Sequence, residues 1–353
     1  MSEILANRHD FMFFVEAKGC NPNGDPDMGN LPRQDEDTEL GYITDVALKR
    51  RIRNYIQDAY GDAPNMQILM QKKACINEKI AESVLAVNNI DKFPDDETEN
   101  KKKKPYKNKK TDETEKYMSD KYWDVRTFGG VLSTGRNAGQ VRGAVQLTGA
   151  NFSLDPIQPK SITITRMCYT DGGDYSTLEE YRKADQELVE DDKKCTMGTK
   201  TYIPYGLYLV RGSVSACLAK KNGFTEDDLN KFYEAIIQMY NHDISSSKEG
   251  MSVVGPLIIF KHVGTQAPEN EEQNKNEARL GCAPAYKLFE LLDIKKKENV
   301  IIPRKYDDYD ITLNVTGIPR GVCVGFKSYP FEAVKWYDGG TPDQYRDLDI
   351  TLK

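Results

Sequence analysis

The sequence is poor in the residues that bind metals or form disulfides. Its 353 residues include only three histidines, and His9, His242 and His262 share no metal-ligand spacing. The seven cysteines are odd in number and scattered without a C-x-x-C pair, which predicts neither a disulfide framework nor a zinc site. We therefore expect a reducing compartment, no bound metal and no other cofactor.

Long hydrophobic runs and targeting signals are also missing. No apolar run approaches about 20 residues, and the N-terminus has no basic segment followed by an apolar core. These absences predict a cytoplasmic protein that has no membrane partner. The sequence also lacks G-x-x-x-x-G-K-[ST] and G-x-S-x-G, so nucleotide hydrolysis and serine chemistry lose support.

The charge balance excludes a protein that is basic throughout, such as a histone. The net charge is −6, yet 49 lysines and arginines leave room for local basic surface. Where the cations lie therefore matters more than their total.

The most distinctive stretch begins at the apolar run Phe11–Val15, which is short enough for a strand buried on both faces. Between Gly19 and Arg33, Asn-Pro, Asn-Gly and Asp-Pro follow one another and predict a shaped loop. Thr44 can then cap a helix, whose apolar face would carry Leu48, Ile52, Tyr55, Ile56 and Ala59. We call residues 19–33 the Asn/Gly loop.

Cations lie outside the apolar face of this helix. Lys49 and Arg53 are four residues apart and share one edge, while Arg50 points away from the core. The unit is therefore a strand, a shaped loop and a basic helix.

Further along the chain, strands and helices alternate in a known order. Alternating residues predict a half-buried strand at 161–169, and strand-like runs follow at 200–214 and 253–260. A helix with a capping-box pattern begins at Thr225. The predicted fold is α+β, with the ferredoxin-like (RRM-like) βαββαβ order that RNA-recognition domains use.

The segments between and after these elements are less informative. Residues 66–87 read as a helix, and the lysine-rich stretch 91–120 as a mobile or loosely helical insertion, either solvated or a basic finger. After residue 265 the sequence predicts a helix at 286–292 and a strand at 310–315. Residues 317–326 read as a glycine-rich loop or a structural turn.

One segment contains no acidic side chain. Between Val125 and Asn151 the polar residues include Arg126, Arg136, Gln140, Arg142 and Gln146 among small residues. Such a segment suits the sugar-phosphate edge of a polyanion. The alternative is that these arginines stack on aromatic rings or bridge subunits.

Asp25 and Asp27 are the only catalytic candidates that we single out. They could hold Mg²⁺ for phosphodiester cleavage, but no general base is recognisable beside them. Turn formation is the simpler role for both.

Taken together, the motifs resemble the Cas-seven family, and more narrowly its type I-C Cascade backbone subunits. The matching segments run in order through residues 10–260: Asn21–Asp27, Thr44–Arg50, Val125–Gly129, Gly139–Gly143, Met197–Lys200 and Pro204–Tyr208. The resemblance implies a non-catalytic subunit that polymerises along a CRISPR RNA and supports recognition of target DNA by guide pairing. It also implies other copies of the chain and Cas-five-type and Cas-eight-type subunits as partners.

The resemblance also implies which residues contact RNA and how the chain divides. The expected RNA contacts are Asn21, Asn23, Arg33, Lys49, Arg50, Arg53, Arg126, Arg136, Gln140, Arg142, Gln146, Arg166, Met197, Thr199 and Lys200. The expected parts are a palm (1–62, 122–165 and 202–264), a lysine-rich finger insertion (63–121), a β-hairpin thumb (166–201) and an accessory region (265–353). Distant type III relatives suggest the alternative, a metal-dependent endoribonuclease that uses Asp25 and Asp27.

Overall fold

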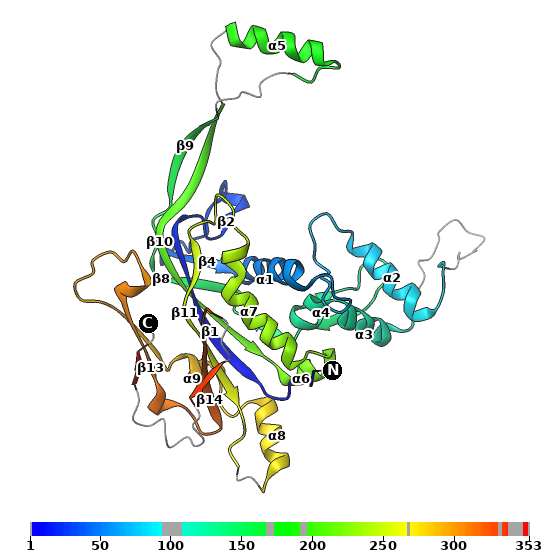
Figure 1. Ribbon diagram of the computed structural model, residues 1–353, viewed down its shortest axis with the longest axis vertical. Coiled ribbons are helices and arrows are strands. Elements are labelled where there is room, and N and C mark those ends of the chain that lie inside the picture. The colour runs from blue at the N-terminus through cyan, green and yellow to red at the C-terminus, as the bar shows by residue number, and fades with distance from the viewer. Residues whose placement is uncertain are drawn as a thin grey trace.

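A computed structural model describes residues 2–93, 108–166, 173–190, 196–266, 269–330, 334–337 and 349–351. Its largest feature is an antiparallel sheet centred on β1 (His9–Cys20), which pairs with β10 (Thr196–Val214) on one side and β11 (Met251–His262) on the other. The strand order is β15 (Lys335–Tyr337), β14 (Val322–Lys327), β11, β1, β10, β8 (Ala150–Pro156) and β4 (Leu40–Thr44). The chain is therefore an α+β protein, as the sequence predicts, and the structure adds that its sheet is large and antiparallel (Figure 1).

The remaining elements connect to or surround this sheet. The other strands are β2 (Gly24–Asp25), β3 (Leu31–Pro32), β5 (Gly129–Val131), β6 (Gln140–Arg142), β7 (Val145–Leu147), β9 (Lys160–Arg166), β12 (Leu292–Lys296), β13 (Tyr309–Asn314) and β16 (Asp349–Thr351). The helices are α1 (Asp45–Tyr60), α2 (Ile76–Asn88), α3 (Thr111–Lys121), α4 (Trp123–Phe128), α5 (Leu178–Glu190), α6 (Ala216–Asn222), α7 (Glu226–His242), α8 (Glu271–Leu280) and α9 (Ala285–Phe289).

Helices α1 and α7 cover one face of the sheet. Thr44 caps α1, and the buried residues of that helix are Leu48, Ile52 and Ile56. They share a core with Phe11, Phe13 and other apolar side chains of β1. The predicted capping box of α7 is present, because Thr225 accepts from the Asp228 backbone and Asp228 accepts from that of Thr225.

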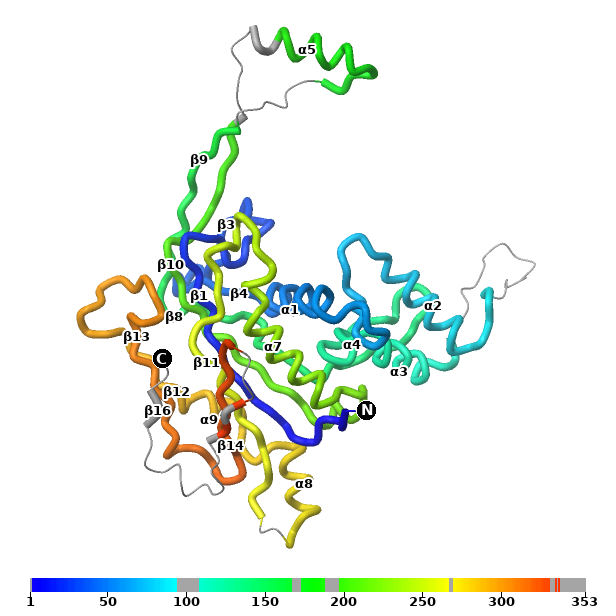
Figure 2. The backbone as a smooth tube through the Cα atoms, in the orientation of Figure 1, coloured from blue at the N-terminus to red at the C-terminus, as the bar shows by residue number. Residues whose placement is uncertain are grey.

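The opposite face is covered by the C-terminal region. Met12 and Phe14, which alternate with Phe11 and Phe13, lie in a second core with Ile311 and Leu313 of β13. The strands β12, β13 and β16 form a separate small sheet over this face (Figure 2). Strand β1 is therefore buried on both sides, as its continuous apolar run predicts.

Beyond the sheet, β9 and the first part of β10 form a two-stranded ribbon. Lys160 pairs with Tyr202 and Arg166 with Thr196. The expectation that the strand near 161–169 has one buried face is wrong, because all seven residues of β9 are exposed. Since β8 pairs with β10 at Ser153 and Tyr208, β8 takes the place in the sheet that we expected for β9.

The insertion before β5 is more ordered than its composition suggests. The helix expected over residues 66–87 begins only at Ile76, and Met66, Ile68 and Leu69 are buried in non-helical backbone. Residues 111–121 form α3, whose Met118 packs with Ile80 of α2. The lysines at 101–104 and 107 lie outside the described residues.

The C-terminal predictions hold with shifted bounds. The expected helix at 286–292 is α9, and the expected strand at 310–315 is β13. Residues 317–326 contain a turn that leads into β14, which pairs with β11. Within the residues that the structure describes, no helix is long and apolar enough to cross a membrane.

His9 makes folding stability dependent on pH. Its ring is buried, with Nδ1 2.9 Å from the Tyr233 hydroxyl, and burial together with nearby Lys261 lowers the pKa of His9 from 6.5 to about 3. The unfolded chain therefore binds one more proton than the folded chain between these values, so stability falls as pH drops below 6.5. We expect a loss of up to about 1.4 kcal/mol per pH unit, measured by urea unfolding from pH 7.5 to 5. His9→Gln should show a shallower slope, and an equal slope would contradict the assignment.

Candidate nucleic-acid interface

The Asn/Gly loop is a built structure rather than a flexible connection. Asn21 is buried and its side-chain amide donates to the Asn30 carbonyl at 2.8 Å. The Asn23 side-chain oxygen accepts from the Thr44 backbone and hydroxyl, both at 2.9 Å, which joins the loop to the start of α1. Both asparagines thus shape the loop, and Arg33 is held by Asp25 at 3.2 Å.

A second loop, residues 243–250, supports the first, and our sequence reasoning missed it. Lys248 donates to the carbonyls of Asn21 and Pro22, and the Asn21 backbone donates to Ser247. Desolvation lowers the pKa of Lys248 to about 8. A lysine in a charged, loop-rich stretch gives no sequence signal of this role, because its acceptors lie more than 200 residues away.

The base of the ribbon meets both loops. Thr201 donates to the Asn30 carbonyl at 2.8 Å, and Lys200 donates to the Ser246 carbonyl at 3.0 Å. Lys200 therefore anchors the ribbon to loop 243–250. The Asn/Gly loop, loop 243–250 and the ribbon base form one junction, which brings together Asn21, Asn23, Arg33 and Lys200 from the expected contacts.

The two faces of the ribbon differ in chemistry. Opposed residues of an antiparallel pair share a face, so Ile162 and Ile164 lie with Lys200 and Gly198 on one face. Thr163, Thr165, Met197 and Thr199 lie on the other. Met197 is 73% exposed, and Arg166 is exposed near the far end. The ribbon therefore presents apolar side chains to solvent on both faces.

The basic edge of α1 is largely engaged within the protein. Lys49 pairs with Asp45 at 2.8 Å, and Arg53 pairs at 2.8 Å with Asp124, which is 1% exposed. Arg50 is exposed and donates to the Met70 carbonyl at 2.6 Å. Of the three, Arg50 is therefore the cation that nucleic acid can reach with least rearrangement.

The structure contradicts the expectation that Arg126 contacts RNA. It is 4% exposed, and its Nη2 and Nε donate to the two Asp228 oxygens at 2.7 and 3.0 Å. It therefore joins α4 to the start of α7 and does not offer a surface contact. The acid-free composition around Arg126 suggested exposure, but its acid partner lies 102 positions away in the sequence.

The other expected contacts of the acid-free segment lie away from the junction. The Arg136 guanidinium stacks 4.1 Å from the Phe93 ring centroid, as our alternative interpretation expects. Gln140 and Arg142 are exposed on β6. Gln146 is half-buried on β7, which pairs with β10 at Gly212–Val214, the end opposite the ribbon. The expected contacts therefore do not all lie at the junction, and Gln146 lies beside the opposite end of β10.

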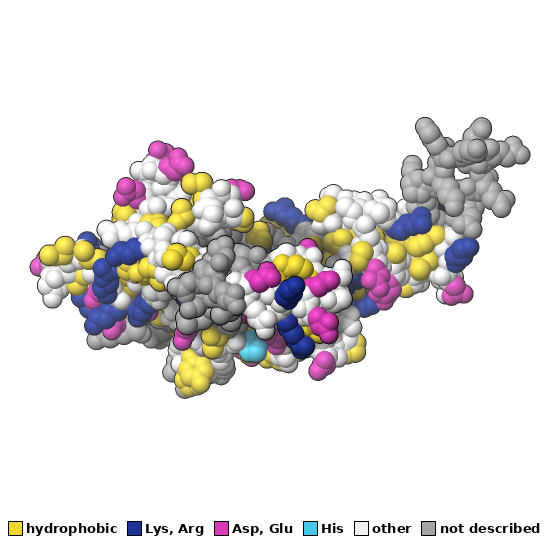
Figure 3. Space-filling view, turned by 90° about the horizontal axis from the view of Figure 1, so that it is seen from above, with side chains coloured by type: hydrophobic (Ala, Val, Ile, Leu, Met, Phe, Trp, Pro, Cys, Tyr) yellow, Lys and Arg dark blue, Asp and Glu magenta, His cyan; other side chains and the backbone are white. Residues whose placement is uncertain are grey.

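The central strands β1 and β11 offer no exposed aromatic side chains for bases. RNA-recognition domains stack bases on aromatic side chains of an exposed sheet. Here Phe14 and Phe260 lie on the face that the C-terminal region covers, and both are 0% exposed. Bases therefore cannot stack on these two rings. Figure 3 shows Lys and Arg interspersed with Asp and Glu on the face that carries α5.

No group of three or more His, Cys, Asp or Glu side chains that could hold a metal occurs among the described residues. Asp25 caps the short helix Pro26–Met28 by accepting from the Asp27 backbone, the turn-forming role expected from the sequence. The three histidines are dispersed, because His9 bonds Tyr233, His242 bonds Asp58 and His262 bonds Asp10.

Comparison with known proteins identifies the family. Residues 7–314 match the model of the family "CRISPR-associated protein Cas7", and the chain belongs to this family. It is 52% identical over 52 residues to a CRISPR-associated protein Cas7 of Haloferax volcanii, a stretch that spans 15% of each chain.

Two solved structures are similar at low identity. The first is a chain of a CRISPR RNA-guided surveillance complex, pre-nicking, with a TM-score of 0.43 and 12% identity over 76% of this chain and 82% of that one. The second is a chain of a CRISPR RNA-guided surveillance complex, with a TM-score of 0.37 and 11% identity over 74% and 72%.

Proposed function

We propose that this protein is a non-catalytic backbone subunit that polymerises along a CRISPR RNA in a type I-C Cascade complex and supports target DNA recognition by guide pairing. Membership of the Cas7 family supports the assignment to CRISPR RNA-binding backbone subunits. The type I-C assignment, with Cas-five-type and Cas-eight-type partners, is supported by the order of the quoted motifs.

The observation that carries the proposal is the ribbon of β9 and β10. An isolated two-stranded ribbon is at best marginally stable in water. This one nevertheless exposes Ile162, Ile164 and Met197, and its base is fixed to two loops. A ribbon built in this way needs a surface outside its own chain to lie against. A guide RNA held between successive copies supplies that surface, and the ribbon is the thumb of the proposed subunit.

The body of the protein suits a ferredoxin-like, RRM-like palm. The strands β11, β1, β10 and β8 are neighbours in that order, and α1 and α7 pack on one side of them. We assign the finger part to α2 and α3. The accessory region, which covers the other face, moves RNA contacts to the edges.

Within this proposal the expected contacts take different roles. Arg50, Gln140, Arg142, Arg166, Met197 and Thr199 touch RNA directly. Asn21, Asn23 and Arg33 hold the Asn/Gly loop in shape, and the loop offers backbone groups to phosphates. The remaining expected contacts touch RNA with side chains that also make contacts within the protein or are half-buried; they are Lys49, Arg53, Arg136, Gln146 and Lys200. The alternative, a ribonuclease that uses Asp25 and Asp27, is not favoured, because Asp25 already binds Arg33 and caps the following turn.

Salt dependence tests the phosphate contacts. For about four phosphates per copy, log affinity should fall with log salt at a slope of about −3, a loss of roughly fiftyfold between 50 and 200 mM. Because phosphates carry no sequence information, guides of different sequence should bind alike. Fluorescence anisotropy with labelled RNA measures both. Affinity that is insensitive to salt would contradict the proposal.

A further inference from the structure

The helix α5 at the end of the ribbon is chemically unlike the rest of the proposed RNA surface. Its 13 residues include five acidic and two basic side chains, a net charge of −3. Thr177 caps it, with Glu180 accepting from the Ser176 and Thr177 backbones. Phosphates repel such a helix, so an RNA contact does not account for it.

The same helix exposes apolar side chains. Leu178 is 71% exposed and Tyr181 is 44% exposed, and Tyr175 packs edge-on against Tyr181 with ring centroids 5.1 Å apart. An acidic helix with an apolar side matches a partner surface that is both basic and apolar.

The chain carries such a surface on its C-terminal region. Residues 295–305, which we call the basic loop, contain five basic residues and one acidic residue. Lys295 pairs with Asp293 and Lys297 with Asp310, so the loop keeps a net charge of +2 for a partner. At its tip Ile301 is 87% exposed and Ile302 is 58% exposed. The charge and the apolar tip are thus both complementary to α5.

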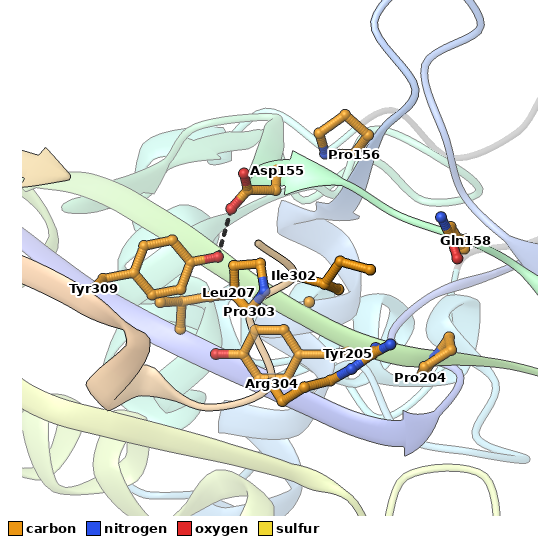
Figure 4. Close-up of a pocket in the computed structure, with 11 residues that line it drawn as sticks. Asp155, Pro156, Gln158, Pro204, Tyr205, Leu207, Ile302, Pro303, Arg304 and Tyr309 are labelled. Atoms are coloured by element: carbon orange, nitrogen blue, oxygen red, sulfur yellow. Dashed lines mark hydrogen bonds between the residues drawn. The ribbon is translucent and has the colours of Figure 1, made fainter. Parts of the chain in front are cut away.

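The basic loop is held rigidly although its tip is exposed. Asp308 accepts from the Arg304 and Lys305 backbones at 2.7 and 3.1 Å, and the Lys297 side chain donates to the Asp307 carbonyl at 2.6 Å. Pro303 is buried beside Tyr205 and Leu207, next to the hydrogen bond from Tyr309 to Asp155 (Figure 4). Fixed backbone with exposed isoleucines is typical of a preformed docking surface.

The two surfaces lie at separate extremities of one molecule. The ribbon carries α5 away from the sheet, whereas the basic loop projects from the side of the C-terminal region (Figure 1). A contact between two different patches on successive copies is head-to-tail, and head-to-tail contacts generate open helical filaments. We propose that α5 of one copy docks on the basic loop of the next copy. This inference rests on the proposed assembly along RNA.

Charge reversal tests the contact. The helix variant is Glu179→Lys with Glu187→Lys, which takes α5 from −3 to +1. The loop variant is Arg304→Glu with Lys305→Glu, which takes the basic loop from +2 to −2 once its two paired lysines are discounted. Each variant alone should need about tenfold more protein to half-saturate a long CRISPR RNA, measured by sedimentation, which is a loss of about 1.4 kcal/mol per contact. A chain that carries all four substitutions should recover, because opposite charges again meet at every junction. An equimolar mixture of the two variants should also recover, because a filament in which the two alternate joins opposite charges at every junction.

Binding to an RNA long enough for only one copy separates this inference from the proposed function. Every variant should bind that short RNA as the unaltered protein does, and failure of the unaltered protein to bind would refute the proposed function instead. Three outcomes overturn the inference. The first is normal assembly of either variant alone. The second is rescue in the chain with all four substitutions but not in the mixture. The third is a loop variant that loses affinity for the short RNA. The second would mean an intramolecular contact, and the third an RNA contact.

Discussion

Arg126→Ala is expected to lower the free energy of unfolding by about 3–5 kcal/mol, because it leaves the Asp228 carboxylate buried without its charged partner. Both side chains are almost fully buried, and the pair links α4 to the first turn of α7. Urea unfolding followed by circular dichroism measures the loss. Arg126→Lys keeps the positive charge but loses the paired hydrogen bonds. Its free energy of unfolding should therefore lie between those of the unaltered protein and Arg126→Ala.

Arg142→Ala is the matched control, since it removes an exposed arginine from the same acid-free segment. It should change stability by less than about 0.5 kcal/mol and reduce the salt slope of RNA binding by about 1. Equal stability of the two alanine variants would show that Arg126 is not a buried structural residue.

Removal of the ribbon is expected to abolish assembly on RNA while the body stays folded. The change replaces residues 162–200 with a short Gly-Ser turn between Ser161 and Thr201, which are cross-strand partners. The body should fold because every residue of β9 is exposed and contributes nothing to the cores. Native mass spectrometry should find single copies on a long CRISPR RNA, where the unaltered protein forms multimers.

A smaller deletion separates the ribbon from its terminal helix. Replacing residues 167–195 with the same linker removes α5 but keeps all seven cross-strand pairs. Multimers should persist on RNA at higher protein concentration, because the ribbon still contacts the guide. Unimpaired assembly of the ribbonless protein would show that β9 and β10 are not the thumb.

The parts of the fold that local signals determine could be predicted from the sequence. The apolar run at Phe11–Val15, the Thr44 cap and the Thr225 capping box each rest on residues within a few positions of one another. The structure bears out all three. Such signals act through backbone and nearest-neighbour geometry, so one sequence suffices to read them.

The parts that depend on distant partners could not be predicted. Alternation at 161–166 looks the same whether one face is buried or neither is, and here neither is. Likewise Arg126 reads as a surface cation until Asp228 is found beside it, and Lys248 gives no signal that it holds the Asn/Gly loop. The covering of the second sheet face by the C-terminal region depends on tertiary packing alone.

The most direct test of the central claim is a nuclease footprint of the unaltered protein on a long CRISPR RNA in the presence of Mg²⁺. We predict a ladder of protected fragments with one constant increment, and guide RNA that stays intact until nuclease is added. Uniform digestion without a repeat, or Mg²⁺-dependent cleavage by the protein that Asp25→Ala with Asp27→Ala abolishes, would contradict a non-catalytic backbone subunit.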